Sequence, residues 1–332
     1  MSSRLMLLAG VAFLVTGIAS AQTEENKALV RRGIEELWNQ QKLEVADEIY
    51  APNYVYHDPS GDYDRDGRKR FIAMYLAAFP DVHFTIDDQL AEGDKVVTRW
   101  TATATHKGEL MGIPPTGAYG PLTGISIYQV ADGMIVEEWS EWDMMGMLEH
   151  MGVVSASRQD YTWGEPSKVT GEPGDPEVNK SIVSRYAEEV WNQHNLDMLD
   201  ELMSTDVISH VPIPGTVLTG LEAHKQTIGV YITAFPDLHN TVEDLIAEGG
   251  KVAERWTATA THQGELMGIP PTGKQVTWTG ITIYRFADGK IVENWWAWNK
   301  LGLMQQLGVV PPLGSQAVEG RTWGKVKVGF RR

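Results

Sequence analysis

The sequence predicts an α+β protein made of two tandem domains of the same kind. The main observation is an internal repeat, because residues Arg99–Gly117 recur at Arg255–Gly273 with one difference, Lys107 against Gln263. The second observation is that each half opens with helix-like spacing of apolar residues and continues with strand-like segments. A repeat spacing of 156 residues is far longer than the roughly 20–50 residues of a solenoid repeat, so it indicates a duplicated domain.

The first 21 residues are typical of a secretory signal. Arg4 precedes an apolar run from Leu5 to Ile18, and Ala19-Ser20-Ala21 forms an A-x-A cleavage site. The run is too short for a membrane anchor, which needs about 20 apolar residues. We therefore expect cleavage after Ala21 and a periplasmic or secreted mature protein with no membrane contact.

Helices are expected at the start of each half, since apolar residues there follow the helical period. The third helix of each half is expected to end before a Phe-Pro-Asp sequence, because proline disfavours helix at the preceding residue. The expected helices are 30–38, 43–50 and 70–78 in the first half, and 182–191, 196–203 and 223–234 in the second.

Strands are expected in the remainder of each half, where Thr, Val and Trp are frequent. Asp132-Gly133 and Asp288-Gly289 predict tight hairpins between the last two strands. The expected strands of the first half are 54–57, 83–91, 96–106, 122–130 and 135–143, followed by a short helix at 144–151. The second half is expected to repeat this order, with strands such as 207–210, 239–247 and 252–262 and a last helix at 300–307.

These segments predict a signal peptide at 1–21, a first domain at 22–167, a linker at 168–176 and a second domain at 177–332. The linker contains Gly171, Pro173 and Gly174, and Trp163-Gly164 recurs as Trp323-Gly324, which assigns a tail to each domain. We expect the first domain to pack on the second as an intrachain pseudo-dimer.

Composition limits the function. The formal net charge is −16 and no basic stripe is present, which argues against a nucleic-acid partner. The chain has no cysteine and no His-Glu-x-x-His spacing, so the sequence implies neither a thiolate site nor a metal. No phosphate-binding glycine loop is found, so no cofactor is predicted.

The last strand of the first half carries the candidate site. Its alternate residues Glu137, Trp139, Glu141 and Asp143 share one face. Three acids on one face would be costly in an apolar core, so this face is either solvent-exposed or lines a pocket. The opposite face holds Glu138, Ser140 and Trp142.

Other polar residues are expected near that pocket. Arg99 is expected to be buried close to Glu137, either as a structural ion pair or as a ligand contact, and Gln129 lies on the neighbouring strand. His57 ends the first strand and is a weaker candidate. The corresponding residues of the second half are His210, Arg255, Arg285, Glu293, Trp295 and Asn299.

Several of these motifs together resemble the SnoaL-like polyketide cyclase family. They are Phe79-Pro80-Asp81, Gly93–Arg99, Thr105–Glu109, Gly112–Gly117, Asp132–Glu137 and Trp142-Asp143, and both halves match over nearly the whole mature chain. The resemblance implies two cone-shaped α+β barrels, each a curved antiparallel sheet closed by about three helices around an apolar pocket. It also implies intramolecular aldol condensation without metal or cofactor, with an aspartate at the position of Asp143 as acid/base.

The two halves differ at this position, because the second has Asn299, which does not exchange a proton at neutral pH. The family's pocket histidine falls on Gln129 and Arg285, so neither half has it. We therefore expect a catalytic first pocket and a degenerate second one.

Two functions stay open. The first is a cyclase or isomerase, with a hydrolase as a variant, in which Asp143 removes a proton next to the carbonyl of a small hydrophobic substrate. Arg99, Gln129, Glu137, Trp139, Glu141 and His57 would contact that substrate. The alternative is a non-catalytic periplasmic carrier or sensor of small apolar ligands, and a pure scaffold would need both pockets filled by side chains.

Overall fold

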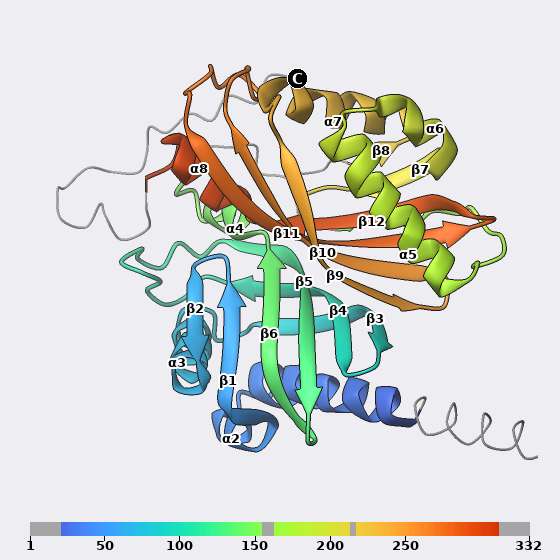
Figure 1. Ribbon diagram of the computed structural model, residues 1–332. Helices are drawn as coiled ribbons and strands as arrows, with labels where there is room; N and C mark the ends of the chain where they lie inside the picture. Colours follow the sequence, from blue (N-terminus) through green and yellow to red (C-terminus); the bar gives the residue numbers. More distant parts are fainter. Residues whose placement is uncertain (1–20, 155–162, 213–216, 312–332) are drawn as a thin grey trace, which may run out of the picture.

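The computed structural model describes residues 21–154, 163–212 and 217–311 and contains two six-stranded sheets with helices on their outer sides (Figure 1). The predicted fold class is confirmed: each half is an α+β domain with the same strand order. The predicted signal peptide and Trp323-Gly324 lie outside the described residues. Within the described ranges, no helix combines the length and the hydropathy that a membrane span needs.

Domain 1 begins with a helix over residues 21–33, which continues into the π-helical turn η1 (Ile34–Asn39). The strand order of its sheet is β2-β1-β6-β5-β4-β3, with β1 and β6 parallel and all other neighbours antiparallel. The remaining elements of domain 1 are η2 (Leu43–Val45), α2 (Ala46–Ile49), β1 (Tyr50–Asp58), β2 (Gly61–Asp64), α3 (Arg65–Ala78), β3 (His83–Glu92), β4 (Lys95–Thr105), β5 (Tyr119–Ala131), β6 (Met134–Trp142) and α4 (Met144–His150).

Domain 2 repeats this arrangement with the strand order β8-β7-β12-β11-β10-β9. Its elements are α5 (Pro176–Arg185), η3 (Tyr186–Asn192), η4 (Leu196–Met198), α6 (Leu199–Leu202), β7 (Met203–His210), β8 (Val217–Thr219), α7 (Leu221–Ala234), β9 (His239–Glu248), β10 (Lys251–Thr261), β11 (Gln275–Ala287), β12 (Lys290–Trp298) and α8 (Lys300–Leu307). The short edge strands β2 and β8 were not predicted, because three or four residues are too few to show an alternating pattern.

The two sheets face each other in the middle of the molecule. The helices α2, α3, α5, α6 and α7 lie outside, whereas α4 and α8 contact each other across the boundary between the domains (Figure 1). An apolar core fills the space between the sheets. Its members come from both domains at equivalent positions: Leu90 and Ile246, Val97 and Ala253, Ile125 and Ile281, Ile127 and Ile283, and Trp139 and Trp295.

Polar contacts across this interface are reciprocal. The Glu92 carboxylate accepts a hydrogen bond from the Ala247 backbone N–H at 2.8 Å, and Glu248 accepts one from Ala91 at 3.0 Å. The guanidinium of Arg99 lies 4.6 Å from the Trp295 ring centre, and that of Arg255 lies at the same distance from Trp139. A face that contacts its own copy in this way is an isologous interface, here built within one chain.

We expect Ile283→Ala to lower the free energy of unfolding by about 2–5 kcal/mol, because Ile283 is fully buried between the sheets. Urea unfolding followed by tryptophan fluorescence measures this. Val230→Ala on α7, where the side chain is 40% exposed, is the control and should stay within about 0.5 kcal/mol of the parent. An equally small effect at Ile283 would show that the interface does not contribute to the stability of the fold.

Candidate functional site

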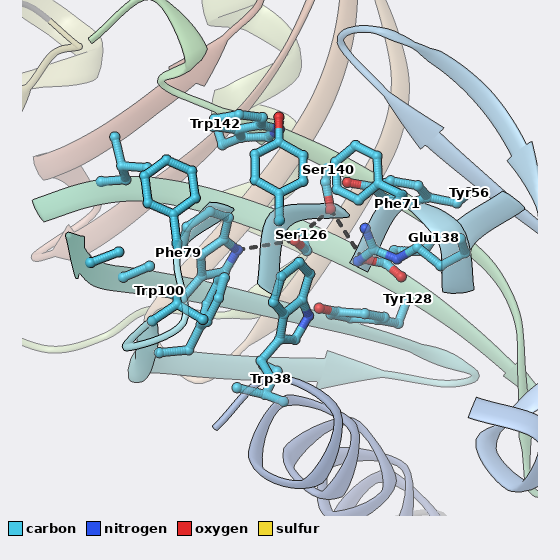
Figure 2. A pocket seen from close by; sticks show the side chains of 18 residues that line it. Trp38, Tyr56, Phe71, Phe79, Trp100, Ser126, Tyr128, Glu138, Ser140 and Trp142 are labelled. Carbon is cyan, nitrogen blue, oxygen red and sulfur yellow. Dashed lines mark hydrogen bonds and ion pairs between the residues drawn. The ribbon is translucent and has the colours of Figure 1, made fainter. Parts of the chain in front are cut away.

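Domain 1 has a cavity of about 80 Å³ between the helix-covered face of its sheet and the helices (Figure 2). Half of the residues that line it are aromatic, with Trp38, Phe71, Phe79, Trp100 and Trp142 around the cavity. Gly124 helps to create this wall, because a Cβ at that position would overlap the Trp100 ring. The Trp100 indole therefore lies flat against β5 and donates a hydrogen bond to Ser126 Oγ at 3.1 Å.

One ion pair lies in this apolar wall. Arg68 Nη2 donates to Glu138 Oε1 at 2.9 Å, and both side chains are at most 5% exposed. The Tyr54 hydroxyl donates to Glu138 Oε2 and Ser140 Oγ donates to Oε1 at 3.2 Å. The Glu138 carboxylate thus receives three donors, which compensate the cost of burying its charge.

Arg68 has donors to spare. The Arg68 guanidinium lies 3.6 Å from the Tyr56 ring centre. Burial alone would lower the pKa of Arg68, but Glu138 and the surrounding tyrosines hold that pKa well above its usual value, so the side chain stays charged. Arg68 Nε and Nη1 are buried and have no hydrogen-bond partner among the described residues. Such orphaned donors on a cavity wall are suited to an oxygen of a bound molecule.

Local structure explains how these residues reach the cavity. Asp64 caps α3 by accepting the Gly67 N–H at 2.7 Å, so Arg68 lies in the first turn of that helix. It precedes Phe71, Ile72 and Tyr75 on the buried stripe of α3. A basic residue on an apolar stripe is a sequence signal for a buried ion pair, but Arg68 was not among the predicted site residues.

The strand face that lines the cavity differs from the predicted one. On β6 the cavity residues are Glu138, Ser140 and Trp142, whereas the prediction chose the face of Glu137, Trp139 and Glu141. Alternation along the strand separates the two faces but does not say which faces inward, and acids occur on both. The chosen face turns toward domain 2.

Five of the predicted residues do come together, in a cleft of about 360 Å³ between the domains: His57, Trp139, Glu141, Arg255 and Asn299. His57 stacks on Trp139 with the ring centres 5.6 Å apart and contacts the Glu137 carboxylate at 3.0 Å. Thr279 of domain 2 donates to Glu141, whose pKa burial raises well above the usual value.

The predicted Arg99–Glu137 pair does not form. β5 lies between β4 and β6, which separates the two strands by roughly 10 Å. Arg99 Nη1 instead lies 3.9 Å from Asp87 Oδ2, and its guanidinium covers Trp163 and Trp295. Gln129 bonds Asp94 near the end of β5, away from the cavity.

In domain 2 the residues that correspond to His57, Trp139 and their neighbour Glu137 lie beneath the predicted linker. Arg285 Nε donates to Glu293 at 2.8 Å and its Nη1 donates to the Val169 carbonyl at 3.0 Å. His210 Nε2 contacts Glu293 at 2.9 Å, and its ring stacks on Trp295 at 5.2 Å. Arg285, Glu293, His210 and Trp295 thus form a cluster of domain 2 that contacts the predicted linker at Val169.

Asp143 is buried, but it is not on the wall of the cavity. It caps α4, since its Oδ1 accepts the Gly146 N–H at 2.8 Å, and Oδ2 is buried without a partner among the described residues. Burial raises the pKa of Asp143 to about 7, although the nearby Lys300 opposes this shift. Asn299 caps α8 in the same way through Gly302 at 2.7 Å.

No cluster of three metal-ligating side chains occurs in the part of the chain that the structure describes. A smaller cavity of about 50 Å³ lies at the equivalent place in domain 2 and contains Glu254. Both cavities are therefore aromatic chambers with few polar groups, the usual character of small-molecule sites.

Comparison with known proteins identifies two matching regions. The model of the SnoaL-like polyketide cyclase family matches residues 28–151 and 181–307. The nogalonic acid methyl ester cyclase of Streptomyces nogalater is 26% identical over 119 residues, which are 36% of this chain and 89% of that protein.

Solved structures match single domains. AclR from Streptomyces galilaeus is 33% identical and covers 41% of this chain and 100% of its own, with a TM-score of 0.37. IdmH from Streptomyces antibioticus is 34% identical and covers 38% of this chain and 98% of its own, with a TM-score of 0.35.

We expect Asp143→Asn to become progressively more stable than the parent protein as the pH rises from about 4 to 7. The folded protein retains a proton on Asp143 that the unfolded chain releases near pH 4, so this carboxyl costs stability above that pH, up to roughly 4 kcal/mol. Urea midpoints at pH 4.5, 6 and 8 measure the trend. The helix cap should survive, because Asn299 already fills the same role, and a difference that does not change with pH would contradict the buried, raised-pKa carboxyl.

Proposed function

From the premise that the chain belongs to the SnoaL-like polyketide cyclase family, we propose that the domain 1 cavity performs acid–base chemistry on a small hydrophobic carbonyl compound. Membership supports an enzyme of the cyclase or isomerase type. The proposed reaction is an aldol-type ring closure or an isomerisation that needs no cofactor.

The observation that carries the proposal is the Arg68–Glu138 pair in an aromatic cavity. The spare Nε and Nη1 donors of Arg68 suit a carbonyl oxygen, and they suit the enolate formed from it even better, because charge-assisted hydrogen bonds are stronger. Donors that strengthen as negative charge develops lower the barrier rather than only increasing affinity. Trp100 and Trp142 would hold the flat carbon skeleton.

The proposed steps use these two side chains. Glu138 accepts the proton from the carbon next to the carbonyl, and the enolate oxygen accepts hydrogen bonds from Arg68. The enolate carbon then forms a bond to a second carbonyl carbon of the same molecule, whose oxygen receives the proton back from Glu138. No atoms are gained or lost, so the ring closure needs neither an oxidant nor a reductant.

Asp143, the residue that the family resemblance indicates, is the rival proton acceptor. Its pKa of about 7 suits general base catalysis near neutral pH. Glu138 has the advantage of position, because it faces the cavity, whereas the Asp143 side chain is engaged as the cap of α4.

A non-catalytic carrier or sensor is the second candidate. It is favoured by the three donors that already bond the Glu138 carboxylate, since these bonds occupy lone pairs that a general base would use to accept a substrate proton. Ligand binding without turnover would decide for this candidate.

Turnover should depend on Glu138 and Arg68. Nogalonic acid methyl ester serves as the first test substrate. Deuterium uptake next to the carbonyl of a simple β-diketone measures proton abstraction without requiring the natural substrate. We expect Glu138→Gln to lower kcat by about 10²–10⁴-fold and Arg68→Met by about 10²–10³-fold, as is usual for a general base and for an oxyanion donor.

Asp143→Asn is the matched control for these variants and should retain most of the activity, with circular dichroism verifying each fold. Loss of activity in Asp143→Asn with full activity in Glu138→Gln would transfer the role of base to Asp143. No deuterium uptake by the parent protein would leave the carrier as the better explanation.

We also propose that the protein acts after export, because its N-terminal 21 residues have the pattern of a signal peptide. The mature protein is then expected to begin at Gln22. Intact-mass spectrometry of the extracytoplasmic fraction of the native host should give the mass of residues 22–332, and Ala21→Leu should block processing by removing the small residue at the cleavage site. Recovery of the full-length chain from the cytoplasm would refute export.

A further inference from the structure

The cavity of domain 2 has kept its aromatic wall and changed its polar groups. Tyr231, Trp256, Trp298 and Tyr284 of this cavity correspond to Tyr75, Trp100, Trp142 and Tyr128 of the first. The position of Glu138, in contrast, holds Asn294. The ion pair of the first cavity therefore has no counterpart in the second.

A carboxyl has instead appeared on another strand. Glu254 on β10 lies where domain 1 has Thr98 on β4, and it lines the second cavity. Its side chain is 1% exposed. His224 occupies the position of Arg68, the cation of the first cavity. The described residues that line the second cavity include no arginine or lysine.

Glu254 has one satisfied and one free oxygen. The Tyr284 hydroxyl donates to Oε2 at 2.7 Å, whereas Oε1 is buried without a hydrogen-bond partner among the described residues. Burial raises the pKa of Glu254 to about 7, and Tyr284 opposes this only in part. Below about pH 7 the carboxyl is therefore mostly protonated, and its free oxygen is able to donate that proton in a hydrogen bond.

The groups that face Glu254 do not change this state. Tyr284 on β11 and Tyr186 on η3 stay protonated, because burial raises the pKa of both. His224 on α7 stays neutral, since burial lowers its pKa to about 3, and it bonds Tyr186 at 3.1 Å and Ser209 at 2.8 Å. Among the described residues that line this cavity, Glu254 is thus the group that titrates near neutral pH.

We propose that domain 2 holds a second ligand site, in which Glu254 acts as a neutral carboxylic acid and donates a hydrogen bond to the carbonyl oxygen of an uncharged, flat aromatic molecule. The tryptophans of the wall stack on the ring, and Oε1–H reaches the oxygen. An anion is disfavoured, because the described residues of the wall include no arginine or lysine to compensate its charge. The two cavities therefore differ in ligand charge: the first offers spare donors of an arginine, and the second offers a neutral acid.

Acetophenone and benzoate are suitable probes, because they are similar in size and differ in charge. Titration calorimetry on the mature protein at pH 6 should detect acetophenone binding that weakens about 30-fold by pH 8.5, since each pH unit above the pKa of Glu254 reduces the protonated form tenfold. Benzoate should not compete for this site. An acetophenone affinity that does not change with pH, or no acetophenone binding at pH 6, would overturn the proposal.

Two variants separate the carboxyl from a structural role. Glu254→Gln keeps a donor without a titrating proton, so it should bind acetophenone within a few-fold of the parent at pH 6 and with no pH dependence. Glu254→Thr restores the residue that domain 1 has at Thr98, and it should fold and lose binding at least tenfold. Unchanged, pH-dependent binding in Glu254→Thr would assign acetophenone to another site and refute the proposal.

This site does not depend on the proposed reaction in domain 1. Glu138→Gln in the first cavity should leave the pH-dependent acetophenone signal intact, so failure of one proposal does not affect the other. A parallel loss of this signal in Glu138→Gln and in Glu254→Thr would place the probe outside the second cavity and contradict the assignment.

Discussion

The packing of the two sheets against each other determines the remaining architecture. Each sheet has two faces, and the duplication buries one face of each against its copy through Ile125, Ile281 and their neighbours. The helices then cover the opposite faces, and the cavities form beneath them. Because alternation assigns every strand residue to one face, the interface also decides which side chains are available to a ligand.

Matching polar contacts from both domains hold the two sheets in one arrangement. Glu92 and Glu248 each accept a backbone N–H from the other domain, and Arg99 and Arg255 each cover a tryptophan across the interface. Polar groups buried between sheets must find partners, and a copy of the same surface supplies them at matching positions. The symmetry is broken where the linker covers His210, Arg285 and Glu293, while the matching cleft near His57 is open among the described residues.

The two cavities differ in how the charge of a buried carboxyl is compensated. In domain 1 the cost of Glu138 is offset by Arg68 and two hydroxyls. In domain 2 the described surroundings of Glu254 supply one hydroxyl and no cation, so protonation removes the charge instead. The first cavity is consequently suited to stabilising negative charge on a ligand, and the second to donating a hydrogen bond to a neutral one.

The sequence by itself determined the duplication, the fold class and most elements, because these depend on local periodicity and on turn residues such as Asp132-Gly133. It also indicated that β6 carries important acids. Only the tertiary structure decided which face of β6 lines the cavity, since a period of two is the same for both faces and the partner sheet makes the choice. Arg68 and Glu138 are 70 residues apart, and their pairing depends on how α3 crosses the sheet, which no local pattern encodes.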